Sequence, residues 1–116
     1  MKNVLVFTGA YSETLTLGTG EVVVGKGDGI CVFRMNPDDG SLKLLASTKC
    51  PNPTFLAINS KKTHLYTTNE IKNFHDLESG SGCSFSIDAN NGELTFINQR
   101  ISGGLDAAHI YVDSQD

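Results

Sequence analysis

Tryptophan is absent from this chain of 116 residues, and positive charge is scarce. Nine Lys and Arg side chains stand against thirteen Asp and Glu, for a formal net charge of −4. This balance excludes the basic surface that binding to nucleic acids or anionic membranes requires. No apolar run approaches the roughly 18 residues of a membrane-spanning helix. The start, MKNVLVFTGAYSE, lacks the long apolar run and cleavage site of a signal peptide. We therefore expect a soluble, cytoplasmic protein with no nucleic-acid or membrane partner.

Cysteine is also rare. The three cysteines, Cys31, Cys50 and Cys83, are odd in number, and their spacing matches no zinc-binding pattern. A role as small buried apolar side chains is favoured over redox or metal chemistry. Glycines with G-x-G spacing occur in residues 18–29, but no helix signal follows them, as a nucleotide-binding loop requires. We expect neither a metal nor a cofactor, and we interpret residues 11–28 as a long loop or hairpin.

Helical periodicity is missing as well. No segment repeats its apolar residues every 3.6 positions, whereas several short segments are rich in β-branched and aromatic residues and end at Pro, Asn, Asp or Gly. The chain is therefore expected to be all-β. The expected strands are 4–10, 30–35, 42–48, 55–58, 64–69, 84–88, 94–100 and 109–112, with a short additional strand near 22–24. Residues 71–81 are polar and rich in Gly and Ser, and we expect a loop there.

Two segments of the chain repeat each other, GICVFRMNPDDGSLKLL (29–45) and GCSFSIDANNGELTFI (82–97). The matched pairs are Phe33 with Phe85, Gly40 with Gly92 and Leu42 with Leu94, each 52 residues apart. Between the two copies lies PTFLAINSKKTHLYTTNE (53–70), which has the pattern of strand, turn and strand. A period of roughly 40–50 residues with four strands per unit is typical of β-propeller blades. The predicted architecture is therefore a β-propeller.

The chain resembles the seven-bladed propeller lactonases, a family that includes the bacterial type of 6-phosphogluconolactonase and the fungal carboxy-cis,cis-muconate cyclases. The resemblance rests on VFTGAYS, the two repeated segments, NPTFLAINSKKTHLYTTNE and SGGLDAAHIYVD. Blades of this family run as strands A to D outward from the central axis. The resemblance implies strands B to D of a first blade in residues 1–49, a second blade in 53–100, and the first strand of a third in 108–113.

This set of strands cannot close a ring, because a propeller needs at least about four blades. We interpret the chain as an N-terminal fragment of a longer propeller, inactive on its own. The alternative is a self-sufficient β-sheet domain that associates with copies of itself. Isolated blade faces would be large apolar patches, and such patches favour self-association.

Two residues are candidates for catalysis, Glu70 and His109. The resemblance implies that the loops at 11–29 and 71–82 share one rim with the linkers at 50–53 and 102–108. Glu70 ends a B strand on this rim, and in the cyclases a catalytic Glu ends a similar NE phrase in a later blade. The Arg that pairs with that Glu is replaced here by Thr54, so a structural role for Glu70 is the alternative.

His109 begins the next inner strand, where family members often carry a His that faces the channel. Its imidazole could transfer a proton or, when charged, bind an anionic substrate group. A structural role is again the alternative.

The function implied by the resemblance is that of a lactone-handling enzyme. It would either hydrolyse a sugar-acid lactone such as 6-phosphogluconolactone or catalyse muconate cycloisomerisation. The expected partner is a small anionic lactone or a dicarboxylate. The alternative function is a non-catalytic propeller that binds a protein or ligand, because a fold alone does not imply catalysis.

Overall fold

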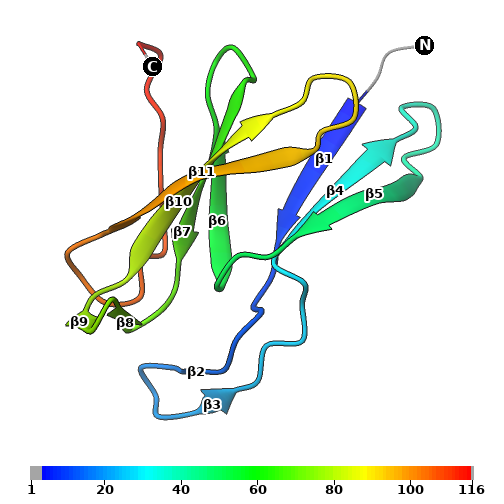
Figure 1. The fold of residues 1–116 in the computed structure, drawn as a ribbon. Helices are drawn as coiled ribbons and strands as arrows, with labels where there is room; N and C mark the ends of the chain where they lie inside the picture. Colours follow the sequence, from blue (N-terminus) through cyan, green and yellow to red (C-terminus); the bar gives the residue numbers. More distant parts are fainter. Residues whose placement is uncertain (1–3, 116) are drawn as a thin grey trace.

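The computed structural model describes residues 4–115, which form two main antiparallel sheets, two small two-stranded hairpins and no helix (Figure 1). The first sheet has the order β1-β4-β5, and the second has the order β11-β10-β7-β6. Each sheet is a simple meander in which neighbouring strands along the chain are also neighbours in space. The strands are β1 (Val4–Gly9), β4 (Ile30–Met35), β5 (Leu42–Thr48), β6 (Pro53–Ile58), β7 (His64–Asn69), β10 (Ser81–Ile87) and β11 (Leu94–Ile101). The all-β prediction is confirmed.

The β4–β5 and β10–β11 hairpins share one turn geometry. The amide of Gly40 donates to the carbonyl of Asn36, and that of Gly92 donates to the carbonyl of Asp88, both at 2.8 Å. The two glycines have φ angles of 74° and 73°, in the left-handed region that other residues adopt only with strain. A register shift follows Val32 in one sheet and Ser84 in the other. The positions matched in the sequence therefore have the same backbone conformation.

The core lies between the two sheets. Its buried members are Ile30, Leu65 and Phe85 together with two cysteines, and Phe7, Leu56, Ile87 and Leu94 pack around them. Strand β1 lies next to β6 (Figure 1). A Cβ atom on Gly9 would lie 2.1 Å from the carbonyl oxygen of Pro53, so only glycine permits this close approach.

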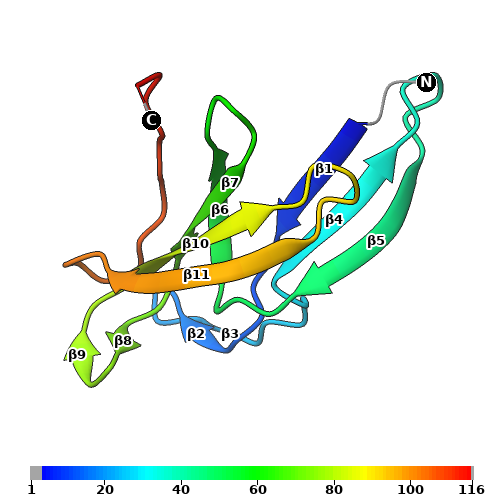
Figure 2. The same ribbon diagram turned by 45° about the horizontal axis from the view of Figure 1, so that its top comes forward.

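Both long connections contain small hairpins that the strand pattern only partly predicts. The first pairs β2 (Leu15–Thr16) with β3 (Val22–Val23), as the expected loop or hairpin at 11–28 allows. The second pairs β8 (Asn73–Phe74) with β9 (Leu77–Glu78), where we expected a plain loop. Figure 2 shows both hairpins at the same end of the molecule. His75 and Asp76 form the β8–β9 turn with φ angles of 49° and 61°, which is why its sequence carries no glycine signal.

The strand expected at residues 109–112 is absent from the described structure, and this expectation is wrong. A strand needs backbone hydrogen bonds from a partner strand, and no described strand pairs with this segment. The segment instead runs as an extended chain after β11 (Figure 1). The division of the chain at residues 1–49, 53–100 and 108–113 otherwise stays a prediction. No helix of the described residues could cross a membrane.

Candidate functional site

Four connecting segments meet at one end of the two sheets, which we call the rim. They are the loop between β1 and β4, the linker between β5 and β6, the loop between β7 and β10, and the segment that follows β11 (Figures 1 and 2). Hydrogen bonds join each of these segments to at least one of the others. Polar groups from distant parts of the sequence therefore converge at the rim.

Asn52 holds three of these segments together. Its side-chain oxygen accepts from the backbone N–H groups of Ser12 (3.0 Å) and Glu13 (2.8 Å), and its amide nitrogen donates to the carbonyl of Glu70 (3.1 Å). The side chain is buried, and its backbone has a φ angle of 42°. Asn offers both a donor and acceptors, and it tolerates a positive φ better than most residues. Asn52, which lies between two prolines in the linker, thus connects three segments of the rim through its side chain.

Ser12 adds two hydrogen bonds to those made by Asn52, and we call the two residues together the clamp. Its hydroxyl donates to the carbonyl of Cys50 (2.6 Å) and accepts from the backbone N–H of Asn52 (3.0 Å). The clamp therefore satisfies backbone groups of the β5–β6 linker that would otherwise be buried without partners.

Asn69, the first residue of the NE phrase, has a structural role in the described fold. Its amide nitrogen donates to the carbonyl of Pro51 (2.8 Å) and to Sγ of Cys50 (3.1 Å), and its oxygen accepts from the hydroxyl of Ser81 (3.1 Å). The Ser81 hydroxyl in turn accepts from the side chain of Gln99 (2.8 Å). Asn69 and Ser81 are both fully buried. Each polar atom named here has a partner, which makes this buried network stabilising rather than costly.

Glu70 lies half-buried directly beyond β7, and its carboxylate accepts a hydrogen bond from the hydroxyl of Tyr11 (3.1 Å). Burial of the phenol raises the pKa of Tyr11, and the hydrogen bond to the Glu70 carboxylate and its charge raise it further. The phenol therefore remains a protonated donor at neutral pH. This arrangement keeps the Glu70 carboxylate oriented at the rim.

Glu70 also lines a rim pocket of about 300 Å³. The other lining residues are Glu13, Thr14, Leu15, Thr16, Asn52, Ile71, Lys72, Asn73 and Asp106. Lys72 forms an ion pair with Asp106, whose second carboxylate oxygen is buried without a hydrogen-bond partner among the described residues. Three carboxylates against one ammonium give the pocket a negative lining. Such a lining suits the hydroxyl groups of a neutral ring better than an anionic group.

His109 lies outside this pocket. Its imidazole is exposed and contacts the ring of Phe55 on β6, with the ring centroids 4.5 Å apart. The two candidate residues from the sequence therefore occupy separate places, Glu70 in the rim pocket and His109 beside an inner strand. Their catalytic roles stay predictions.

The sequence reasoning missed Tyr11, Asn52, Lys72 and Asp106. The repeat gives no indication of these four residues, because they lie in loops and linkers outside the matched positions. In the sequence, Asn52 is visible only as part of the linker at residues 50–53. No group of three or more potential metal ligands occurs in the part of the chain that the structure describes.

Comparison with known proteins assigns the chain to a family. The chain belongs to the lactonase family of seven-bladed β-propellers, whose family model matches residues 6–116. The predicted resemblance is therefore confirmed. The two sheets are blades of an open, incomplete ring.

Two known proteins are similar in sequence to this chain. The chain is 33% identical over 100 residues to the 6-phosphogluconolactonase of Bacillus subtilis (strain 168), covering 84% of this chain and 27% of that protein. It is 35% identical over 89 residues to the 6-phosphogluconolactonase of Formosa agariphila, covering 75% of this chain and 24% of that protein. The chain thus spans about a quarter of the length of these relatives.

Solved structures show the same fold. A putative 6-phosphogluconolactonase from Bacteroides uniformis superposes with a TM-score of 0.79 at 22% identity, covering 97% of this chain and 29% of that one. The periplasmic gluconolactonase of Pseudomonas aeruginosa gives a TM-score of 0.71 at 26% identity, covering 91% of this chain and 26% of that one.

Proposed function

We propose that this chain forms part of a lactonase that hydrolyses a sugar-acid lactone such as 6-phosphogluconolactone. The observation that carries the proposal is the similarity to two proteins named 6-phosphogluconolactonase, at 33% and 35% identity. The rim pocket supports it with a half-buried carboxylate and a hydroxyl-binding lining. Because the chain covers about a quarter of those relatives, it is expected to be inactive alone.

Lactone hydrolysis needs a base for the attacking water and a proton for the departing ring oxygen. In this proposal Glu70 takes a proton from the water as the water oxygen bonds to the carbonyl carbon. The ring C–O bond then breaks, and the alkoxide takes that proton back from Glu70. Tyr11 orients the carboxylate throughout. His109 is the second candidate for proton transfer, on the Phe55 side of β6.

The charge of the pocket suggests how a substrate would be oriented. Glu13, Glu70 and Asp106 would repel a phosphate, and Lys72 is already paired with Asp106. The hydroxylated ring would therefore enter the rim pocket, and cations outside this chain's pocket would hold the phosphate. A muconate dicarboxylate brings two negative charges to the same lining, so the cycloisomerase alternative has no support from the pocket.

A chimera tests the proposal. The segment of the Bacillus subtilis enzyme that matches this chain is replaced by this chain, and hydrolysis of 6-phosphogluconolactone is measured. We expect activity, and a loss of kcat of about 10²-fold or more in Glu70→Gln, the typical size for removing a general base. Glu78→Gln, at an exposed residue of β9, is the matched control and should leave kcat unchanged.

Two other outcomes have definite meanings. A chimera that folds, as judged by circular dichroism, and has no activity would favour the non-catalytic binding module. Full activity in Glu70→Gln with a large loss in His109→Ala would move the base to His109.

The proposal also includes a cytoplasmic location and self-association of the isolated chain. Exposed apolar side chains such as Phe96 (57% exposed) and Ile97 (49%) support self-association. Sedimentation of the purified chain tests this, and a monomer at high concentration would contradict it. Cell fractionation tests the cytoplasmic location, and finding the protein in the periplasm would contradict it.

A further inference from the structure

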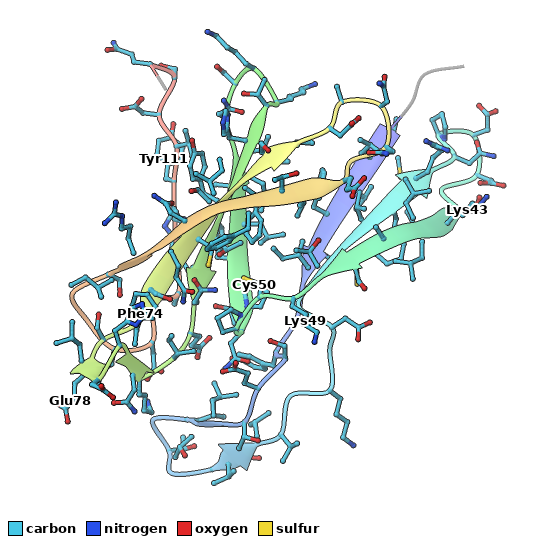
Figure 3. All side chains as sticks on the ribbon, viewed as in Figure 1. Lys43, Lys49, Cys50, Phe74, Glu78 and Tyr111 are labelled. Carbon is cyan, nitrogen blue, oxygen red and sulfur yellow. The ribbon has the colours of Figure 1, made fainter. Side chains whose placement is uncertain are left out.

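Two of the three cysteines lie together between the sheets. Cys50 belongs to the linker between β5 and β6, Cys83 belongs to β10, and both are members of the same buried core cluster. Figure 3 shows Cys50 at the junction of the two sheets, beside Lys49. Cys31, on β4, is half-buried and is not part of that cluster. The proposed lactonase mechanism uses none of these thiols.

The surroundings of Cys50 are polar, unlike those of a cysteine that serves only as an apolar side chain. The Asn69 amide donates to Sγ of Cys50 at 3.1 Å, and the hydroxyl of Thr67 lies 3.7 Å from it. The same Thr67 hydroxyl accepts from the backbone N–H of Cys83 at 3.3 Å. One hydroxyl thus connects the two cysteines.

These surroundings shift the pKa values of the two thiols in opposite directions. The Cys83 thiol, followed by Thr67 and Asn69, lowers the pKa of Cys50 below its ordinary value, against the opposing effects of burial and the Glu13 charge. The interaction with Cys50 and burial raise the pKa of Cys83. Cys50 is therefore the more acidic of the two thiols, and Cys83 holds its proton more tightly. A thiolate is the reactive form of cysteine.

Cys50 is also open to a cavity of about 520 Å³. The other lining residues are Ser12, Glu13, Gly27, Asp28, Ser47, Lys49 and Pro51. Cys50 is only 5% exposed, so the site proposed below requires a reagent to approach the residue from this cavity. The volume is sufficient for a small organic molecule.

We propose that Cys50 and Cys83 form a dithiol site that reacts with small disulfides and closes into an internal disulfide. The Cys50 thiolate attacks one sulfur of the reagent, whose S–S bond breaks and releases one thiolate. Cys83 then loses its proton to that thiolate, and its sulfur attacks Sγ of Cys50, which releases the second thiolate. The reagent is reduced to two thiols, and the protein dithiol is oxidised by two electrons.

The test treats the folded chain with oxidised glutathione near pH 7 and maps the products by peptide mass spectrometry. We expect the loss of two hydrogen atoms and a peptide that links Cys50 to Cys83. In Cys83→Ser a glutathione adduct should accumulate on Cys50, and Cys31→Ser should behave as the wild type. An adduct on Cys31 with Cys50 and Cys83 both free would overturn the proposal, as would a stable Cys50 adduct in the wild type.

A second measurement does not depend on replacing a cysteine. The rate of Cys50 alkylation by iodoacetamide is followed against pH, with the chain in guanidinium as the unfolded reference. We expect a lower midpoint in the folded chain than in the unfolded chain, where it should lie near the unperturbed value of about 8.5. Thr67→Val should slow alkylation at pH 7 several-fold, while Thr68→Val, on the same strand, should not. Equal midpoints, or equal effects of the two variants, would contradict the proposal.

Discussion

The two sheets have the same backbone plan but end differently at the rim. In the first sheet the amide of Ala10 donates to the carbonyl of Gly29, where the loop after β1 meets the start of β4. At the corresponding place in the second sheet Asn69 pairs with Ser81, and both side chains are polar and buried. The shared turns and register shifts show that the strands are equivalent, so the difference lies in the side chains at the rim.

The residues that follow these positions meet each other. Tyr11 comes after Ala10, Glu70 comes after Asn69, and the Tyr11 hydroxyl donates to the Glu70 carboxylate. The first sheet thus supplies small residues and a donor, and the second supplies the buried network and the acid. The two sheets have similar backbones, and the Tyr11–Glu70 contact forms at corresponding positions where their side chains differ.

Removing the buried amide of the second sheet should have the largest effect. Asn69→Ala removes the acceptor of the Ser81 hydroxyl and the donor to the Pro51 carbonyl. We expect it to lower the free energy of unfolding by about 2–4 kcal/mol. Denaturation of the chain by urea measures this. Asn98→Ala, at an exposed residue of β11 whose side chain accepts one hydrogen bond from the Ser84 hydroxyl, is the control, with an expected loss of about 1 kcal/mol or less. Equal losses would mean that the network is not a source of stability.

Replacing the two turn glycines should lower the stability of the chain by different amounts, although their φ angles agree. A Cβ on Gly92 would lie 2.6 Å from Cγ2 of Val32, whereas a Cβ on Gly40 would have no neighbour within 4 Å. We expect Gly40→Ala to cost about 1 kcal/mol from backbone strain alone, and Gly92→Ala about 2–3 kcal/mol because crowding adds to it. Thermal unfolding of both variants measures the difference. Equal costs would show that the second turn does not pack on the first sheet.

The linker between the sheets offers a finer test at Asn52. Asn52→Gly and Asn52→Ala both remove the side-chain hydrogen bonds, but only Gly is free of strain at a φ of 42°. Both variants should be less stable than the wild type, and Ala should be about 1 kcal/mol less stable than Gly. Urea denaturation measures both. A more stable Ala variant would mean that the linker has changed its backbone conformation.

The smallest effect is expected at the contact between the two sheets. Because the pKa of Tyr11 is raised in the folded chain, its contribution to stability is complete below the unfolded pKa near 10 and is lost as the pH rises through the folded value. The wild type should therefore lose more stability than Tyr11→Phe between pH 8 and pH 11. Urea midpoints of both proteins at the two pH values measure this. Parallel losses would indicate that Tyr11 does not titrate differently in the folded chain.

Much of the fold could be predicted from local sequence. The turns around Gly40 and Gly92 contain residues that favour turns, and the strands beside them have a clear composition. The candidate site was predictable only in part. Glu70 was found as the end of a strand, but Tyr11, 59 positions earlier, was not found, because nothing local links the two residues. The hairpin at β8–β9 was missed because non-glycine residues adopt its positive φ angles.

By itself, the sequence determined the all-β class and the family, because strand composition and turn chemistry depend on neighbouring residues. Tertiary structure alone decided which loops meet at the rim, how Asn52 and Asn69 bind them, and that Cys50 lies beside Cys83. It also decided that residues 109–112 form no strand, since a strand needs hydrogen bonds from a partner. These features depend on contacts between residues far apart in the chain, which no local pattern specifies.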